Sequence, residues 1–344
     1  MSKIIFNENY ANLEIKNFQI FLDQLLSKKE KISFKNLDVN IVNENKQLFK
    51  FENIVFANFG HKKNSIKGKI FGKKFKVELG NNSKSIKFRI LKSGISADLD
   101  LDEKERTGIF KSKILNTNLK LNFEYDNEKL KILNSYFRSK NLSFKHKSLI
   151  TFDPYQDIKT NLEIEEIKFK IFKKINFTKL IEFKDDIKKI NSQNSITYKP
   201  KNFSKSFIDN LNLKINLAYG RLYFNKKFLL AKNLFECEGD LNIFEEYPLL
   251  YFDCSILINN KKDLLKKFSI NIKTNEDVLR LKAKGNLNIL NKKINYDKIL
   301  INETISSKED LKYYKNSFEN ILFDESFLEI FVLKKIKSFI SEII

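Results

Sequence analysis

The sequence predicts a mainly β protein built on a long, curled antiparallel β-sheet, with a few amphipathic helices and a helical C-terminus. Apolar residues recur at every second position between residues 66 and 125, which is the period of a strand with one buried and one solvated face. Short turn-forming stretches separate these segments and favour antiparallel neighbours. The same alternation returns after residue 205.

About fifteen such strands would each have to hide an apolar side, either against a second sheet or in an open trough. Strands of six to eight residues would span roughly 20–26 Å, which is wide enough for an acyl chain. The predicted trough is lined collectively by the apolar members of the clearest strands. These candidate lipid-facing residues are Ile66, Ile70, Phe75, Val77, Leu79, Ile86, Phe88, Ile90, Leu99, Leu101, Leu119, Leu121, Phe123, Leu213, Ile215, Leu217, Leu279, Leu281, Leu287 and Ile289.

In chain order, residues 1–30 form a predicted N-terminal segment, with a short amphipathic helix over 17–27. A first β-groove half follows over residues 31–190 and ends in a helix over 177–190. Residues 191–204 are predicted to be a linker or loop, because they are polar, contain a proline and lack periodicity.

The second β-groove half occupies residues 205–304 and includes a short helix over 260–268. Residues 305–344 form the predicted C-terminal helices, where Ser306 and Glu309 have the spacing of a capping box. We expect the last helix to pack over one end of the sheet. The alternative is an interfacial amphipathic helix that touches a membrane.

The charge of the chain suggests an anionic partner. It carries 64 Lys and Arg against 43 Asp and Glu, a formal net charge of +21, as expected of a protein that meets nucleic acid, a membrane surface or lipid head groups. A codon bias from an AT-rich genome is the alternative origin of the lysines. No specific nucleic acid is expected, because the charge recurs along the whole chain without a compact patch.

Catalytic and metal-binding patterns are absent from the sequence, so we expect no enzyme activity, no cofactor and no metal site. His61 and His146 are predicted to be exposed, since both stand in lysine-rich stretches. The carboxylates at 98, 100 and 102 share one strand face and are predicted to be solvated. Cys237 and Cys254 could pair on adjacent strands, but we expect two buried free thiols.

The strand pattern resembles a known family. The segments 65–77 and 211–224 look like the C-terminal part of AsmA-like proteins, a family that includes TamB-type proteins and is similar to the eukaryotic bridge-like lipid-transfer proteins. The resemblance covers roughly residues 30–300 and depends on pattern rather than on invariant residues. It implies an elongated, taco-like β-groove with a lipid-accommodating interior.

The resemblance also implies a place and partners. These are the periplasmic side of the inner membrane of a Gram-negative bacterium, a phospholipid or other acyl-chain lipid, the membrane surface and an inner-membrane partner. Family members usually begin with a membrane anchor, whereas this sequence shows neither a signal peptide nor an anchor. A cytosolic chain and a piece that lacks its leader both stay open.

The leading hypothesis is therefore a non-enzymatic lipid-accommodating β-groove protein involved in phospholipid transport or cell-envelope (outer membrane) assembly. Two alternatives are a closed β-sandwich that serves as a binding or structural protein, and a cytosolic polyanion binder.

Overall fold

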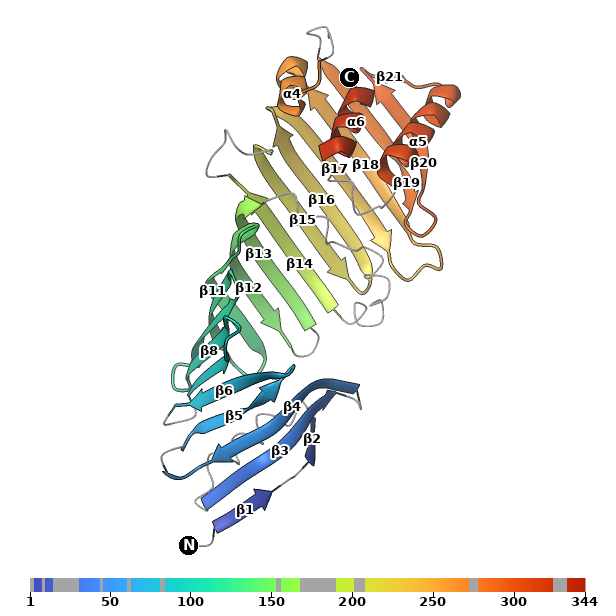
Figure 1. The fold of residues 1–344 in the computed structure, drawn as a ribbon. Coiled ribbons are helices and arrows are strands. Elements are labelled where there is room, and N and C mark those ends of the chain that lie inside the picture. Colours follow the sequence, from blue (N-terminus) through green and yellow to red (C-terminus); the bar gives the residue numbers. More distant parts are fainter. Residues whose placement is uncertain are drawn as a thin grey trace. The chain divides into compact units, whose positions relative to one another are not determined.

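The computed structural model describes residues 3–7, 10–14, 31–43, 46–60, 63–80, 84–152, 156–167, 190–200, 208–271, 278–323 and 333–343. All strands among them belong to one sheet, and the described helices follow residue 260 (Figure 1). The predicted mainly β class with a helical C-terminus is confirmed. The alternative of a closed β-sandwich requires two facing sheets, whereas the described strands form one sheet.

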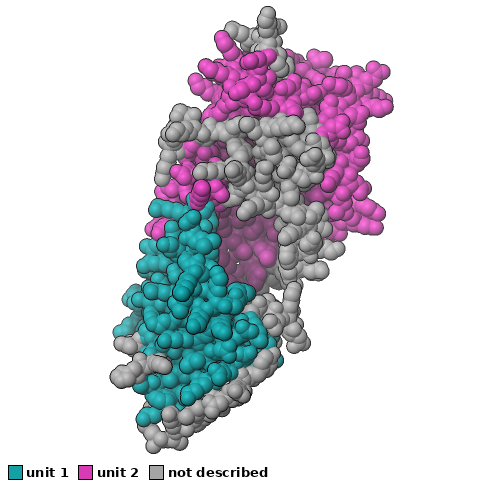
Figure 2. Space-filling view, viewed as in Figure 1, with its two compact units in different colours: residues 1–126, 137–139 teal, residues 127–136, 140–344 magenta. Residues whose placement is uncertain are grey.

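The chain forms two compact units (Figure 2). The first contains residues 1–126 and 137–139, and the second contains residues 127–136 and 140–344. Strand β11 (Lys129–Arg138) contributes residues to both. The units therefore divide at β11, whereas the sequence suggested a division at 191–204.

In the first unit, each strand from β3 to β9 pairs antiparallel with the next one. The two N-terminal strands instead pair parallel with β3. The strands are β1 (Lys3–Asn7), β2 (Tyr10–Glu14), β3 (Lys31–Asn43), β4 (Lys46–Ala57), β5 (Ser65–Ile70), β6 (Lys73–Leu79), β7 (Ser85–Ile90), β8 (Ile95–Asp102), β9 (Thr107–Ile114) and β10 (Thr117–Tyr125).

In the second unit, the pairings from β14 to β21 are antiparallel, as is that of β12 with β13, but β13 and β14 are parallel. The strands are β12 (Leu142–Thr151), β13 (Gln156–Ile167), β14 (Ile190–Tyr198), β15 (Asn210–Ala218), β16 (Arg221–Leu230), β17 (Asn233–Asn242), β18 (Leu249–Ile258), β19 (Leu279–Asn288), β20 (Lys293–Ile301) and β21 (Thr304–Ile305).

Strand β14 shows that the predicted linker at 191–204 is wrong for residues 191–198. This strand carries polar side chains from Asn191 to Ser195, so it lacks the apolar alternation that marks the other strands. Its backbone nevertheless pairs with both neighbours over its length. Backbone pairing, which does not depend on side-chain polarity, holds the strand in the sheet.

Strand β9 was also missing from the predicted set. Its apolar pattern is interrupted by Gly108 and Ser112 on one face, and by the exposed Ile109 on the other. Gly108 is needed there because a Cβ atom would lie 2.3 Å from Cζ of Phe123 and 2.9 Å from Cδ2 of Leu101. The aromatic ring of the neighbouring strand therefore occupies the space of the missing side chain.

Two-residue turns join several of the hairpins. Phe71 and Gly72 have φ values of 51° and 71° between β5 and β6, and Tyr219 and Gly220 have 48° and 83° between β15 and β16. Positive φ at both central residues matches the right-handed twist of the flanking strands. These turns fix the register that keeps the apolar side chains on one face.

The predicted helix over 17–27 and residues 177–189 of the predicted helix over 177–190 lie outside the described residues, and residue 190 begins strand β14. The predicted helix at 260–268 is confirmed as α4 (Lys261–Phe268), whose N-cap Asn260 accepts a hydrogen bond from the backbone N–H of Asp263 at 2.8 Å.

The C-terminal helices are α5 (Lys308–Phe323) and α6 (Leu333–Ile343). The capping box of α5 lies one residue later than predicted: the backbone N–H of Asp310 donates to Oγ of Ser307, and the N–H of Ser307 donates to Asp310. Aspartate can replace glutamate at this spacing because it accepts the same hydrogen bond. Within the described residues, no helix has the length and apolar character needed to cross a membrane.

Candidate functional site

The candidate site is the apolar face of the sheet, here called the inner face. In the first unit, the register aligns apolar residues from strand to strand. One complete row crosses five strands, and its members are Leu79, Ile86, Leu99, Phe110 and Leu121. Cross-strand neighbours of this kind shield one another and make the face continuous.

Most of the predicted lining residues of the first unit are half-buried rather than fully buried. Ile70, Phe75 and Leu79 are buried. Phe75 is enclosed by aromatic neighbours, with ring centroids 5.4 Å from Phe51 and 5.9 Å from Phe88. The half-buried members are Ile66, Val77, Ile86, Phe88, Ile90, Leu99, Leu101, Leu119, Leu121 and Phe123. The described part of this unit contains no helix.

The second unit has an apolar inner face of its own across the strands that follow β14. One row is apolar through six strands: Leu217, Leu222, Leu241, Leu250, Leu287 and Ile294. Of the predicted residues, Leu279 and Leu287 are buried, while Leu213, Ile215, Leu217 and Leu281 are half-buried.

The prediction that Ile289 lines the trough is wrong, because this residue lies in the turn after β19 and not on a strand. The side-chain oxygen of Asn288 accepts hydrogen bonds from the N–H groups of Leu290 at 3.1 Å and Asn291 at 2.9 Å. An asparagine that binds the following backbone in this way ends the strand and starts a turn.

Helices α5 and α6 cover one part of the inner face in the second unit, over β18 to β20 (Figure 1). Phe318 of α5 and Phe339 of α6 pack against each other with ring centroids 5.2 Å apart, and both contact the sheet. The predicted packing of the C-terminal helices over the sheet is therefore confirmed for the described part of these helices. In this region, α5 and α6 therefore cover the inner face and form a roof over it.

A cavity of about 200 Å³ remains beneath this roof. Its lining is almost entirely apolar or aromatic: Phe252, Cys254, Ile256, Leu281, Lys282, Ala283, Tyr296, Ile299, Ile301, Tyr314, Phe318 and Phe339. An apolar cavity of about 150 Å³ stays dry and takes up a benzene-sized group, so this one has room for part of a hydrocarbon chain. Burial, together with the charge of Glu319, raises the pKa of the Tyr296 hydroxyl, which stays protonated.

Polar side chains interrupt the inner face near β12 to β14. His146, predicted to be exposed, is half-buried in β12, and burial lowers its pKa. Its Nε2 lies 2.7 Å from Oγ of Ser148, which in turn lies 2.8 Å from Oγ1 of Thr160. Asn194 of β14 donates a hydrogen bond to the carbonyl oxygen of Ile215 at 3.2 Å. His61, the second histidine, lies outside the described residues.

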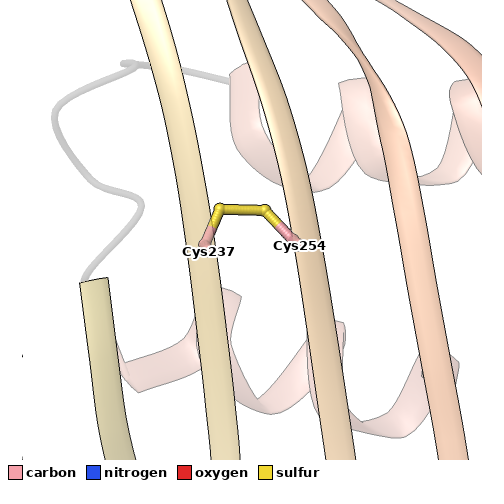
Figure 3. The surroundings of a disulfide bond; sticks show 2 residues. All are labelled: Cys237 and Cys254. Carbon is pink, nitrogen blue, oxygen red and sulfur yellow. A yellow bond between two sulfur atoms is a disulfide. The ribbon is translucent and has the colours of Figure 1, made fainter. Parts of the chain in front are cut away.

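Cys237 and Cys254 form a disulfide, so the prediction of two free thiols is wrong (Figure 3). The two residues are directly opposite each other on β17 and β18, with Cα atoms 4.0 Å apart. The sequence could not show this pairing, because it depends on the register between the two strands. The disulfide lies on the inner face, and Cys254 also lines the cavity.

The outer face of the first unit carries a row of cations. Lys67, Lys76 and Arg89 lie directly opposite one another on three successive strands, and Lys113 extends the row beyond Ser96. Lys76 also pairs with Glu78 on its own strand. Like charges placed directly opposite each other destabilise a sheet.

The adjacent row on this outer face alternates in sign. Its members are Glu78, Lys87, Asp98 and Lys111. Asp98 therefore lies between two lysines and is half-buried, so the prediction of a solvated carboxylate is wrong for this residue, whereas residues 100 and 102 are exposed as predicted. In the described ranges, no group of three His, Cys, Asp or Glu side chains is placed to hold a metal ion.

Comparison with family models gave no match, and comparison with curated proteins gave none either.

Proposed function

We propose that this protein is a non-enzymatic, lipid-accommodating β-groove that holds or conducts phospholipid acyl chains in cell-envelope assembly. The observation that carries the proposal is the inner face: unbroken apolar rows cross successive strands in each unit, and most of their side chains remain half-buried. Contiguous apolar surface of this kind marks sites that bind something apolar.

The dimensions of the strands support an acyl chain as the ligand. Strand β15 has nine residues and therefore extends for roughly 30 Å. One leaflet of a bilayer provides about half of a roughly 30 Å hydrocarbon core. An acyl chain thus fits against the apolar side of one strand.

The disulfide supports the periplasm as the site of action. Disulfides form and persist in oxidising compartments, which include the bacterial periplasm, and they are rare in the cytosol. The bond between Cys237 and Cys254 fits the location implied by the resemblance to AsmA-like proteins. It argues against the alternative of a cytosolic polyanion binder.

The outer cation row supports a membrane surface as a partner. Anionic head groups would neutralise the repulsion among Lys67, Lys76, Arg89 and Lys113, and each basic residue near such a surface contributes about 1 kcal/mol. In this proposal the outer face of the sheet contacts the membrane surface, and the inner face holds the bound lipid.

The test is lipid retention by the full chain and by two matched variants of β15. Ile215→Glu places a charge on the inner face, and Lys214→Glu places the same charge on the outer face of the same strand. Mass spectrometry of the purified proteins should show phospholipid bound to the wild type and to Lys214→Glu, and less bound to Ile215→Glu. A lipid-free, stable wild type that takes up no lipid from liposomes would overturn the proposal.

A further inference from the structure

A lysine stands on the inner face of the second unit. Strand β16 alternates regularly, with Tyr223, Asn225 and Lys227 exposed and the intervening side chains half-buried. Lys226 is one of these half-buried residues and lies on the same face of the strand as they do. Its partners in the neighbouring strands are Leu213 on β15 and Cys237 on β17, so its surroundings in the sheet are apolar.

Within the described residues, the ammonium group of Lys226 interacts only with an aromatic ring. Its Nζ lies 5.0 Å from the centre of the Phe228 ring, a cation–π contact. No hydrogen bond or ion pair is formed by this ammonium among the described residues. Burial lowers its pKa, and no acid among the described residues opposes that effect.

The outer face of the same strand shows the contrast. Lys227 pairs with Glu236 at 2.6 Å, and Arg221 pairs with Asp240 at 2.9 Å, each across to β17. Both outer-face cations of β16 therefore form an ion pair with an acid of β17, whereas Lys226 on the inner face forms none with any described residue. A partly buried charge without a partner lowers stability, and an anionic ligand would relieve that cost.

The cavity beneath α5 and α6 lies in the same row as Lys226. The row runs from Lys226 through Cys237 and Cys254 to Ala283, and the last two residues line the cavity. Adjacent strands are about 4.8 Å apart, so Cys254 lies about 10 Å from Lys226 along the sheet. A single ligand can span a charged site and an apolar site at that distance.

We propose that Lys226 binds the anionic head group of a lipid, and that the hydrocarbon of the same molecule extends across β17 and β18 into the cavity beneath α5 and α6. This inference rests on the proposed lipid-binding function and adds a charge preference to it. An ammonium pairs with a phosphate or carboxylate more strongly in apolar surroundings than in water.

The test compares two lipids that differ only in the charged group. Oleoyl lysophosphatidate and monooleoylglycerol share one acyl chain and the glycerol, and their binding to the delipidated full chain is measured by titration calorimetry. A charge-assisted hydrogen bond contributes about 1.5–3 kcal/mol, so the wild type should bind the phosphate-bearing lipid about tenfold or more tightly.

Three variants assign the preference to one side chain. Lys226→Met keeps an unbranched side chain of similar length but no charge, and should bind the two lipids with similar affinity. Lys226→Arg and the outer-face control Lys227→Met should keep the preference of the wild type. Thermal unfolding should show Lys226→Met to be at least as stable as the wild type, because it removes an unpaired charge from apolar surroundings.

The outcomes separate the two proposals. If Lys226→Met still binds the phosphate-bearing lipid more tightly to the same extent as the wild type, Lys226 does not bind the head group. The proposed lipid binding is not affected by that result. If the wild type binds neither lipid, the proposed function itself fails. If inorganic phosphate binds the wild type as tightly as the lysolipid does and depends on Lys226, the site takes free phosphate, and the assignment of a lipid head group is wrong.

Discussion

The carboxylate of Glu319 accepts a hydrogen bond from the backbone N–H of Ile294 at 2.7 Å, which attaches helix α5 to strand β20. Its side chain is only 12% exposed and also pairs with Lys293 at 3.3 Å. This contact lies at the base of the roof over the cavity. The position of α5 therefore depends on a polar contact as well as on the aromatic packing of Phe318.

Glu319→Ala should loosen the roof. The change leaves the Ile294 N–H without its acceptor, at a cost of about 1–3 kcal/mol for a buried donor. Amide hydrogen exchange in α5 should become faster, while exchange in β15 should stay unchanged. The exposed neighbour Asn320→Ala is the control, and equal exchange in the two variants would contradict the role of Glu319.

Gly108→Ala should destabilise the first unit. The added Cβ would lie 2.3 Å from the ring of Phe123, so the ring must move, at about 1–3 kcal/mol for an overpacked site. Phe123→Leu in the same chain should restore part of the loss, because it removes the ring. Denaturant unfolding measures both, with the outer-face Lys111→Ala as control; a Gly108→Ala protein as stable as the wild type would show that the ring is not confined there.

Replacing the disulfide cysteines with serine should lower stability. The bond joins residues 17 positions apart, and a loop of this length contributes about 3 kcal/mol. Reductant should destabilise the wild type by a similar amount and leave the Cys237→Ser/Cys254→Ser double variant unchanged. Thiol titration that finds two free thiols in the native, non-reduced protein would rule out the bond.

His146 should make stability depend on pH. Its pKa is lowered by burial in the folded protein, so the unfolded chain binds more protons between that lower value and the ordinary value of about 6.5. Stability is fully present above the ordinary value and falls as the pH drops through this window, by at most about 1.4 kcal/mol per pH unit for one proton. His146→Asn should flatten this slope in urea unfolding curves, and an unchanged slope would contradict the assignment.

Much of the fold could be predicted because the strands alternate so regularly. Strand β15 is the clearest case, with Leu211, Leu213, Ile215 and Leu217 all on one face. Strands β9 and β14 could not be predicted in the same way. Gly108 makes room for a ring from another strand, and the polar residues of β14 are held through the backbone, so in both cases the cause lies in the neighbouring strand.

The predicted lining residues lie on the inner face except for Ile289, but its polar members were missed. Lys226 is two residues from both Phe224 and Phe228 in the sequence. The alternation of β16 therefore already predicted that its side chain lies on the inner face. The cavity and the disulfide could not be found this way. Both depend on which strands and helices meet, and the sequence alone does not give that register.

Site-specific photocrosslinking tests the lipid groove most directly. A photoreactive residue is placed at Ile215 on the inner face, and in a second protein at Lys214 on the outer face of the same strand. After irradiation of the full chain with phospholipid, mass spectrometry should find lipid attached at position 215 in large excess over position 214. Equal labelling at both positions, or labelling at 214 alone, would contradict a lipid path along the inner face of the sheet.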